Sequence, residues 1–430
     1  MIRGRRLGVW RRPGVREPSQ GHEPARPGVN RALGAVLSAL VIFGPISMDL
    51  YLPALPALTT DLEAPASLGQ LTLSACLLGL AGGQLVAGPL SDRLGRRTLL
   101  LWGIGVYIVS SLVCAAAPTI DALIVARLAQ GLAGSVGLVV AMAAGRDLFE
   151  GPVLLGYYGR LTVISGTAAI VGPVIGGQLA NFTDWRGIFV FLAGLGLLIL
   201  IAAWIWGDET LPTDRRLATD SRLIDGFKLL RSDRTFVAMV LGIGFSTSAI
   251  FAYLGGATYV LQGTYGLSPQ GYSYAFAGNS LSFVLCGVLA SRVARAWSPV
   301  ATLLTGLVMC VCGASSVLVV GLLHLPLPAV LASLATMVGG VAVIAPPATT
   351  LALERYPDIA GTASSILGTS KFLFGAVTAP LIGVGGGVSA VSLGTVTTAA
   401  MVMAAACIIV GRRPMDTLSA QRTRRTSTRV

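Results

Sequence analysis

The chain contains twelve long apolar segments, and this feature constrains its fold more than any other. Each segment has about the length that an α-helix needs to cross a bilayer, roughly 20 residues. A soluble globule could not bury them all, because a single hydrophobic core stops growing with chain length. We predict transmembrane helices at residues 32–58, 70–90, 99–118, 120–146, 157–180, 186–206, 235–261, 271–291, 299–323, 327–352, 361–384 and 388–410.

The composition excludes the main soluble classes. Of the 430 residues, 54% are hydrophobic and 12% are charged, whereas about a quarter of the residues in a soluble domain are charged. This argues against a soluble enzyme, a disordered protein and a nucleic-acid-binding protein. The spans hold too few polar residues for a catalytic dyad, and the sequence has no G-x-x-x-x-G-K-[ST] nucleotide loop. Its cysteines lie in apolar segments without metal-ligand spacing. We expect no enzyme activity, metal site or cofactor.

The basic residues predict the orientation of the chain. With the N-terminus inside, the inside regions carry 28 of the 31 Lys and Arg residues, and the outside loops carry only Arg186. Cytoplasmic loops are rich in Lys and Arg, and an error in the number of spans would destroy this bias. Arg outnumbers Lys by 29 to 2, which is typical of a GC-rich bacterial source. We therefore expect a multi-pass protein of the bacterial inner membrane with both termini cytoplasmic.

A polar stretch divides the spans into six and six. The segment from Gly88 to Arg96 has a faint counterpart from Gly287 to Arg295, at the end of the equivalent span. Two such halves with a substrate path between them form a known transporter architecture. The basic tails are interpreted as cytoplasmic flanks that fix the orientation of the chain in the membrane. The alternative is that they bind RNA or lipid headgroups. The predicted regions are a basic cytoplasmic tail at 1–31, a six-helix bundle at 32–206, a cytoplasmic linker at 207–234, a second six-helix bundle at 235–410 and a basic cytoplasmic tail at 411–430.

The loop between the second and third spans carries the most specific motif. Gly88 is expected to let two helices approach, and Gly95 to permit a tight turn. Asp92 can form charge-assisted pairs with the arginines and, together with Asp147, is expected to build an inner gate that holds the halves together. A basic turn explains the arginines but not the whole register, which resembles the G-x-L-a-D-r-x-G-r-r signature of the major facilitator superfamily. The motif reads Gly88-Pro-Leu-Ser-Asp92-Arg93-Leu-Gly95-Arg96-Arg97.

Three further segments resemble the drug-exporting branch of this superfamily. The fourth span has a counterpart of the family's buried-arginine motif, the fifth has one of its G-P-x-x-G-G antiporter motif, and the first carries an acid before a proline-rich break. Together they resemble the bicyclomycin/chloramphenicol-resistance (Bcr/CflA) type of drug:proton antiporter. The segments read Ala126-Arg127-Leu-Ala-Gln130-Gly131, Gly172-Pro173-Val-Ile-Gly176-Gly177 and Met48-Asp49-Leu-Tyr-Leu-Pro53.

The resemblance implies an all-α membrane protein whose twelve helices form two six-helix bundles around a central cavity. It implies that the protein exports small amphipathic drugs, chloramphenicol-like, bicyclomycin-like or several, by alternating access. The expected partners are a drug or metabolite, protons and the lipid bilayer. No cofactor is expected, because the proton gradient supplies the energy. The protein is expected to be a monomer. Two alternatives stay open: a dedicated efflux or uptake transporter for one endogenous metabolite, and a receptor or scaffold whose basic tails bind partners.

Asp49 is the only acid that we place within the apolar part of any span. A carboxylate in such surroundings is costly unless it faces a cavity or is paired, so it is a functional candidate by default. The alternative is a polar residue near the outer interface beside the break at Pro53 and Pro56. The resemblance adds an acidic residue at this place in the family. We predict that Asp49 carries the transported proton.

Two cations also lie inside spans. Arg127 must find an acid, a carbonyl or a water-filled cavity; we place it beside the path of the Asp49 proton, with a structural arginine bonding carbonyls as the alternative. Lys371 either faces the cavity, where it repels cations and favours neutral or anionic drugs, or snorkels toward the inner boundary. Tyr51, Gln130 and Tyr253 complete the predicted substrate cavity, although most aromatic residues in spans contact lipid or other helices.

The glycines of the fifth span have two readings. Gly172, Pro173, Gly176 and Gly177 are typical of close helix packing with a proline bend. The resemblance implies that this bend also seals the cavity and prevents a proton leak. The two interpretations are compatible.

Overall fold

The computed structural model describes residues 31–149, 151–211, 229–296, 298–353, 356, 360–384 and 387–427. Within these ranges the chain is helical and contains no strand. Twelve helical segments are long and apolar enough to cross a membrane, which confirms the predicted number of spans. Their ends lie within a few residues of the predicted ones; the second, for example, covers Ala66–Leu94 rather than 70–90.

The first span is not one continuous helix. It consists of α1 (Arg31–Leu40), α2 (Phe43–Asp49), a 3-10 turn η1 (Leu52–Ala54) and α3 (Leu55–Asp61). Proline has no N–H group and therefore removes a helical hydrogen bond. Pro53 leaves the carbonyl of Asp49 without its helical donor, and Pro56 does the same for Leu52. The helix therefore breaks directly after Asp49.

The other spans are mostly single long helices, several of which begin at a polar cap. Thr119, Asp184, Asp233 and Ser298 each accept a hydrogen bond from a backbone N–H of the following turn, which satisfies one of the free donors at a helix start. The helices are α4 (Ala66–Leu94), α5 (Arg96–Ala115), α6 (Ile120–Leu148), α7 (Gly151–Leu179), α8 (Trp185–Trp206), α10 (Arg234–Tyr259) with the π-helical turn η3 (Val260–Thr264), α11 (Pro269–Ala296), α12 (Pro299–Leu322), α13 (Leu327–Leu353), α14 (Ala360–Thr378) with the 3-10 turn η5 (Ala379–Gly383), and α15 (Ala390–Ser427).

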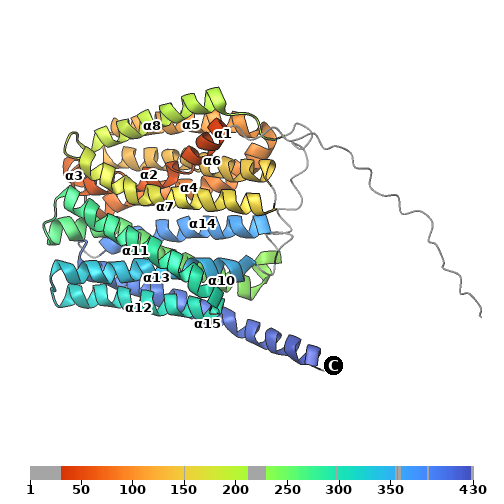
Figure 1. The fold of residues 1–430 in the computed structure, drawn as a ribbon. Coiled ribbons are helices and arrows are strands. Elements are labelled where there is room, and N and C mark those ends of the chain that lie inside the picture. Colours follow the sequence, from red (N-terminus) through yellow and green to blue (C-terminus); the bar gives the residue numbers. More distant parts are fainter. Residues whose placement is uncertain are drawn as a thin grey trace, which may run out of the picture.

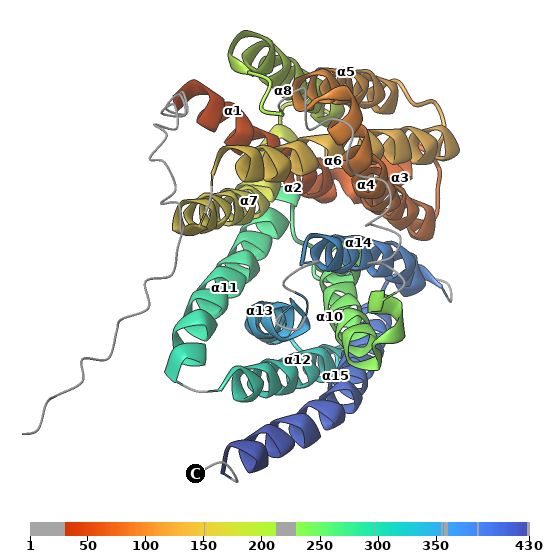
Figure 2. The same cartoon turned by 90° about the vertical axis from the view of Figure 1, so that its right-hand side faces the viewer.

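The helices form two groups, one above the other in Figures 1 and 2. In the N-terminal group (α1–α8), α6 packs against α4 and α5, and α5 packs against α8. In the C-terminal group (α10–α15), α12 packs against α13 and α15, and α15 against α10. The groups meet where α4 lies against α14 and where α7 lies against α11. Most of the predicted linker and both chain ends lie outside the described residues, although α15 continues to Ser427, past the predicted span (Figure 1).

We call the end of the molecule that carries Gly95 the inner end, after the predicted orientation, and the opposite end, which carries Thr119, the outer end. Between the two ends, large apolar side chains point outward from the helices. Trp102, Val125 and Leu198 are each more than 60% exposed. Such a surface would be unfavourable in water and is the one expected for contact with lipid.

Candidate functional site

Asp49 ends helix α2 inside the interface between the two groups. Its exposed fraction is 4%, and it is the only buried carboxylate among the residues whose burial the structure describes. No residue in the described ranges forms an ion pair or a hydrogen bond with it. Tyr253 and Tyr272, both in the C-terminal group, lie within range of its charge. The acid is thus enclosed but unpaired, and it faces the opposite half.

The antiporter-motif glycines on α7 make the contacts that enclose Asp49. A Cβ atom at Gly172 would lie 3.4 Å from the Cβ of Asp49, and one at Gly176 would overlap the carbonyl oxygen of Leu50. Gly177 points to the other half, where a Cβ atom would overlap the hydroxyl of Ser273 on α11. Two glycines therefore bring α7 against the broken first span, and the third brings it against the C-terminal group. Close packing, one of the two interpretations of this motif, describes these contacts, and Pro173 lies within α7 beside them.

Arg127 is fully buried within the N-terminal group and does not contact Asp49. Its Nη1 donates to the carbonyl oxygen of Ser47 at 2.9 Å and to Oε1 of Gln130 at 2.6 Å. Its guanidinium group lies 4.3 Å from the ring centroid of Tyr51, close enough for a cation–π interaction. These contacts fit the second hypothesis for Arg127, that of a structural arginine that bonds a carbonyl group. They nevertheless attach Arg127 to α2, two residues before Asp49.

A buried polar network surrounds this arginine, and the sequence analysis missed it. Gln130 donates to Ser111 at 2.7 Å, and the hydroxyl groups of Ser47 and Tyr107 lie 2.5 Å apart. Buried polar groups need such partners because an unpaired one is costly. The sequence did contain a signal for this network, since Ser and Gln lie at positions inside apolar spans, where a polar side chain needs a partner.

Three of the four predicted cavity residues are buried and do not line an open space. Tyr51 is fully buried and pairs with Thr72 at 3.1 Å. Tyr253 bonds Asn279 at 3.1 Å and stacks on Phe276. Gln130 is occupied by the network around Arg127. In this arrangement the three side chains are occupied inside their own groups, Tyr51 and Gln130 in the N-terminal group and Tyr253 in the C-terminal group. Of the four residues, only Lys371 is partly exposed, and the substrate cavity stays a prediction.

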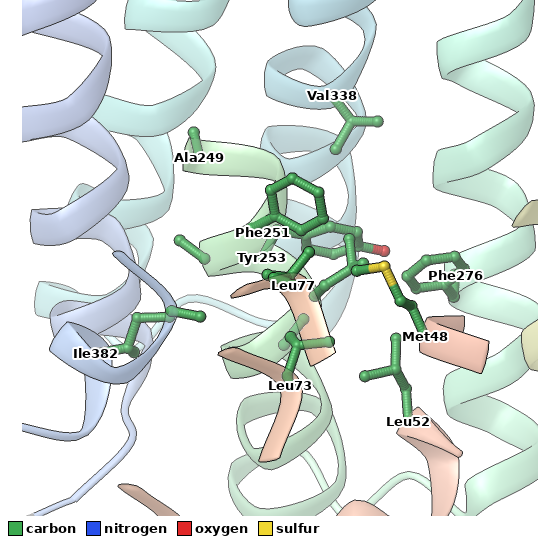
Figure 3. Close-up of a cluster of buried hydrophobic side chains, with 14 of the residues drawn as sticks. Met48, Leu52, Leu73, Leu77, Ala249, Phe251, Tyr253, Phe276, Val338 and Ile382 are labelled. Atoms are coloured by element: carbon green, nitrogen blue, oxygen red, sulfur yellow. The ribbon is translucent and has the colours of Figure 1, made fainter. Parts of the chain in front are cut away.

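An apolar cluster closes the interface between the two groups (Figure 3). It joins side chains of the first span, α4, α10, α11, α13 and η5, so it draws on both groups. Burying such side chains against one another removes apolar surface from water and stabilises the contact. The labelled members are Met48, Leu52, Leu73, Leu77, Ala249, Phe251, Tyr253, Phe276, Val338 and Ile382.

Glutamine and threonine side chains add hydrogen bonds across the outer end. Gln262 donates to the carbonyl oxygen of Pro53, and Thr258 donates to that of Leu52, both at 2.9 Å. Gln70 bonds the carbonyl of Gly255 at 3.3 Å, and Gln270 that of Gly177 at 3.1 Å. These donors, all of which the sequence analysis missed, hold the two groups together on the outer side of Asp49.

At the inner end, the motif of the loop between α4 and α5 lies within the N-terminal group. Arg96 bonds Asp92 at 2.6 Å and Asp147 at 3.0 Å, and its backbone N–H donates to Glu209 at 2.9 Å. Gly95 has φ +91°, a conformation that favours glycine. Arg93 and Arg97 are exposed, and Arg97 donates to the carbonyl of Trp204.

Two expectations about this motif fail in the observed arrangement. The pairs of Arg96 connect α4, α5 and α6 to one another, so they do not hold the two halves together as an inner gate. A Cβ atom at Gly88 would meet no described atom within 4 Å, so the expected close approach of two helices there is also wrong. The gate is not formed because the described partners of Arg96 all belong to the N-terminal half of the chain. The close approach is not formed because Gly88 faces open space rather than a neighbouring helix.

The sequence profile of the Major Facilitator Superfamily matches residues 37–380, and the fold has the twelve spans that the resemblance implied. The chain belongs to the Major Facilitator Superfamily. It is therefore a multi-pass membrane transporter and not an enzyme.

Relatives of this Major Facilitator protein confirm the resemblance to drug-resistance transporters. It is 35% identical to the uncharacterized MFS-type transporter YdgK of Bacillus subtilis, over 82% of this chain and 89% of the relative. It is 32% identical to a chloramphenicol resistance protein of Pseudomonas aeruginosa, over 77% and 78%. Among solved structures, the nucleoside transporter NupG superimposes with a TM-score of 0.70 over 89% of this chain and 99% of NupG; at 14% identity this likeness concerns the fold alone.

Proposed function

We propose that this protein exports small amphipathic drugs from bacterial cells in exchange for protons. Asp49 carries the proton, and the two groups expose it alternately to either side of the inner membrane, with both termini cytoplasmic. Drug export is supported by the chloramphenicol resistance relative. Alternating exposure is the way in which two packed halves transport a substrate around a fixed site.

The observation that carries the proposal is the unpaired burial of Asp49. Burial disfavours the charged form of a carboxyl group, and no described cation offsets the charge here. A neutral, proton-bearing Asp49 fits this closed environment, whereas a charged one fits a wet environment. An acid that changes its proton when its surroundings change between dry and wet is what proton exchange requires.

Arg127 supports Asp49 without pairing with it. Its bond to the carbonyl of Ser47 fixes α2 to α6, and α2 also packs against α7, where Gly172 contacts Asp49. The acid is thereby held in position between α6 and α7. We assign Arg127 a positioning role in proton coupling.

The test is gradient-driven uptake of chloramphenicol, bicyclomycin and cationic dyes into inside-out vesicles. Uptake should collapse with an uncoupler and should be lost in Asp49→Asn. Asp121→Asn is the matched control, because Asp121 is an exposed acid in the first turn of α6 and its variant should transport normally.

Each alternative outcome changes a different part of the proposal. Undiminished gradient-driven uptake by Asp49→Asn would exclude Asp49 as the proton carrier. Uptake of a single compound, or of none of these drugs, would favour the dedicated transporter of one endogenous metabolite.

A further inference from the structure

Lys371 lies in the interface between the two groups, on helix α14. It is eleven residues beyond Ala360, which is about 16 Å along the helix. It shares a helix face with Gly368 and Gly375, three and four residues away. A Cβ atom at Gly368 would meet Gln84 of α4 at 3.3 Å, and one at Gly375 would meet the ring of Phe251 on α10. Lys371 therefore lies on the face of α14 that is turned toward α4 of the other group and α10 of its own, and a lysine that snorkels along the lipid side does not fit this face.

No described residue offers a partner to the charge of Lys371. Within the described ranges, no carboxylate pairs with it and no atom accepts a hydrogen bond from it. Asp49, the buried acid of the interface, forms no ion pair with it in the described ranges. A cation in the interior of a membrane bundle is costly unless it is paired or faces water. The side chain is only partly exposed, so a counter-charge from outside the chain would stabilise it.

An aromatic residue follows Lys371 on α14, on the neighbouring face of the helix. Phe372, the following residue, is partly exposed, and its ring lies 6.0 Å from that of Phe251. Phe251 belongs to the apolar cluster that closes the interface (Figure 3). Gln84 lies on the opposite group at a similar depth, ten residues or about 15 Å from the inner end of α4. On the inner side of the cluster, the interface thus carries a cation and an aromatic ring on α14 and an amide on α4.

We propose that Lys371 determines substrate specificity by binding the anionic group of an aromatic, amphipathic substrate. The ammonium group donates to a carboxylate or a comparable anion, while the ring of Phe372 contacts the apolar body. This inference rests on the proposed export function and extends it by naming the charge class of the substrate. It also separates two roles: the substrate anion is held on the C-terminal group, and the proton is carried on the N-terminal group.

The test is a binding measurement on the purified full-length protein in detergent, without a proton gradient. The probes are chloramphenicol, which is neutral, and chloramphenicol hemisuccinate, which adds one carboxylate to the same body. The variants are Lys371→Gln, which removes the charge, and Lys371→Arg, which keeps it. Lys228→Gln is the matched control, because it removes the only other lysine of the chain.

We expect the wild type to bind the hemisuccinate at least about tenfold more tightly than chloramphenicol, a difference of about 1.4 kcal/mol. Lys371→Arg and Lys228→Gln should keep this preference. Lys371→Gln should bind the two compounds with affinities that agree within about threefold, because the charge-assisted hydrogen bond is lost.

The inference is overturned if Lys371→Gln keeps the preference for the anion, if the wild type shows no preference, or if the wild type binds neither compound. Its failure is distinguishable from failure of the proposed function. Proton coupling is read from uptake by Asp49→Asn in vesicles, whereas this measurement uses no gradient and leaves Asp49 intact.

Discussion

The contacts of α7 with the first span predict opposite outcomes for two substitutions that lie one helical turn apart. In Gly172→Ala the new methyl group would sit 3.4 Å from the Cβ of Asp49, which is ordinary van der Waals contact. In Gly176→Ala it would overlap the carbonyl oxygen of Leu50, far inside the 3.0 Å that real Cβ atoms keep. The chemical change is the same, and both positions belong to the same helix and the same motif.

The magnitudes follow from these contacts. Replacing Gly by Ala inside a helix stabilises it by about 0.8–1 kcal/mol when the methyl group fits, so Gly172→Ala should lie within about 1 kcal/mol of the wild type. At Gly176 the neighbour is backbone, which cannot rotate away as a side chain can. The two segments must separate, and overpacking of this kind costs typically about 1–3 kcal/mol. Gly176→Ala should therefore be the less stable variant despite its higher helix propensity.

The assay is thermal unfolding of both purified variants in the same detergent, followed by tryptophan fluorescence. We expect a melting temperature near that of the wild type for Gly172→Ala and one several degrees lower for Gly176→Ala. Equal melting temperatures for the two variants would refute the close approach of α7 to Leu50. A lower value for Gly172→Ala than for Gly176→Ala would reverse the assignment of the two faces of α7.

Two further predictions concern the ends of the molecule. Gln262→Leu removes the hydrogen bond to the carbonyl of Pro53. Hydrogen exchange should become faster in Leu52–Ala54 and η3 and stay unchanged near the inner end. Unchanged exchange at the outer end would contradict the role of this hydrogen bond in holding the two groups together. Arg96→Ala breaks largely buried pairs and should lower the free energy of unfolding by about 1–3 kcal/mol. Asp61→Asn breaks a pair in which the side chains of Arg186 and Asp61 are 35% and 52% exposed. That substitution should lower the free energy of unfolding by less than about 1 kcal/mol. Thermal unfolding of the two variants side by side checks this order.

The spans and the break in the first of them could be predicted from sequence because they depend on local properties. Bilayer thickness sets the length of an apolar helix, and a missing N–H at Pro53 disrupts the helix whatever lies around it. The unusual position of Asp49 followed from the same reasoning, since an acid in an apolar segment stands out without knowledge of its neighbours. The turn at Gly95, with its positive φ, is also a local property.

The partners of the buried groups could not be predicted, because they depend on how the helices are placed. Arg127 required some acceptor, but its choice of the Ser47 carbonyl rather than Asp49 follows from the packing of α6 against α2. The expected inner gate failed for a related reason. Arg96 pairs with Asp92 and Asp147 of its own group, and the sequence alone does not show whether such pairs form within one half or between the two halves.

The geometry of the break connects Asp49, the proposed proton carrier, to the closure of the outer end. Only Leu50 and Tyr51 separate Asp49 from Leu52, whose carbonyl accepts the hydrogen bond of Thr258 from the other half. Gly176 holds Leu50 against α7 in the same short stretch. Asp49 cannot reach water from the outer side while these contacts persist, because the segment that would have to move is the one they hold. Loss of the outer hydrogen bonds and outward exposure of Asp49 are therefore one movement. Under the proposed exchange, this joins proton uptake from the outer side to the opening of the outer end without a separate signal between them.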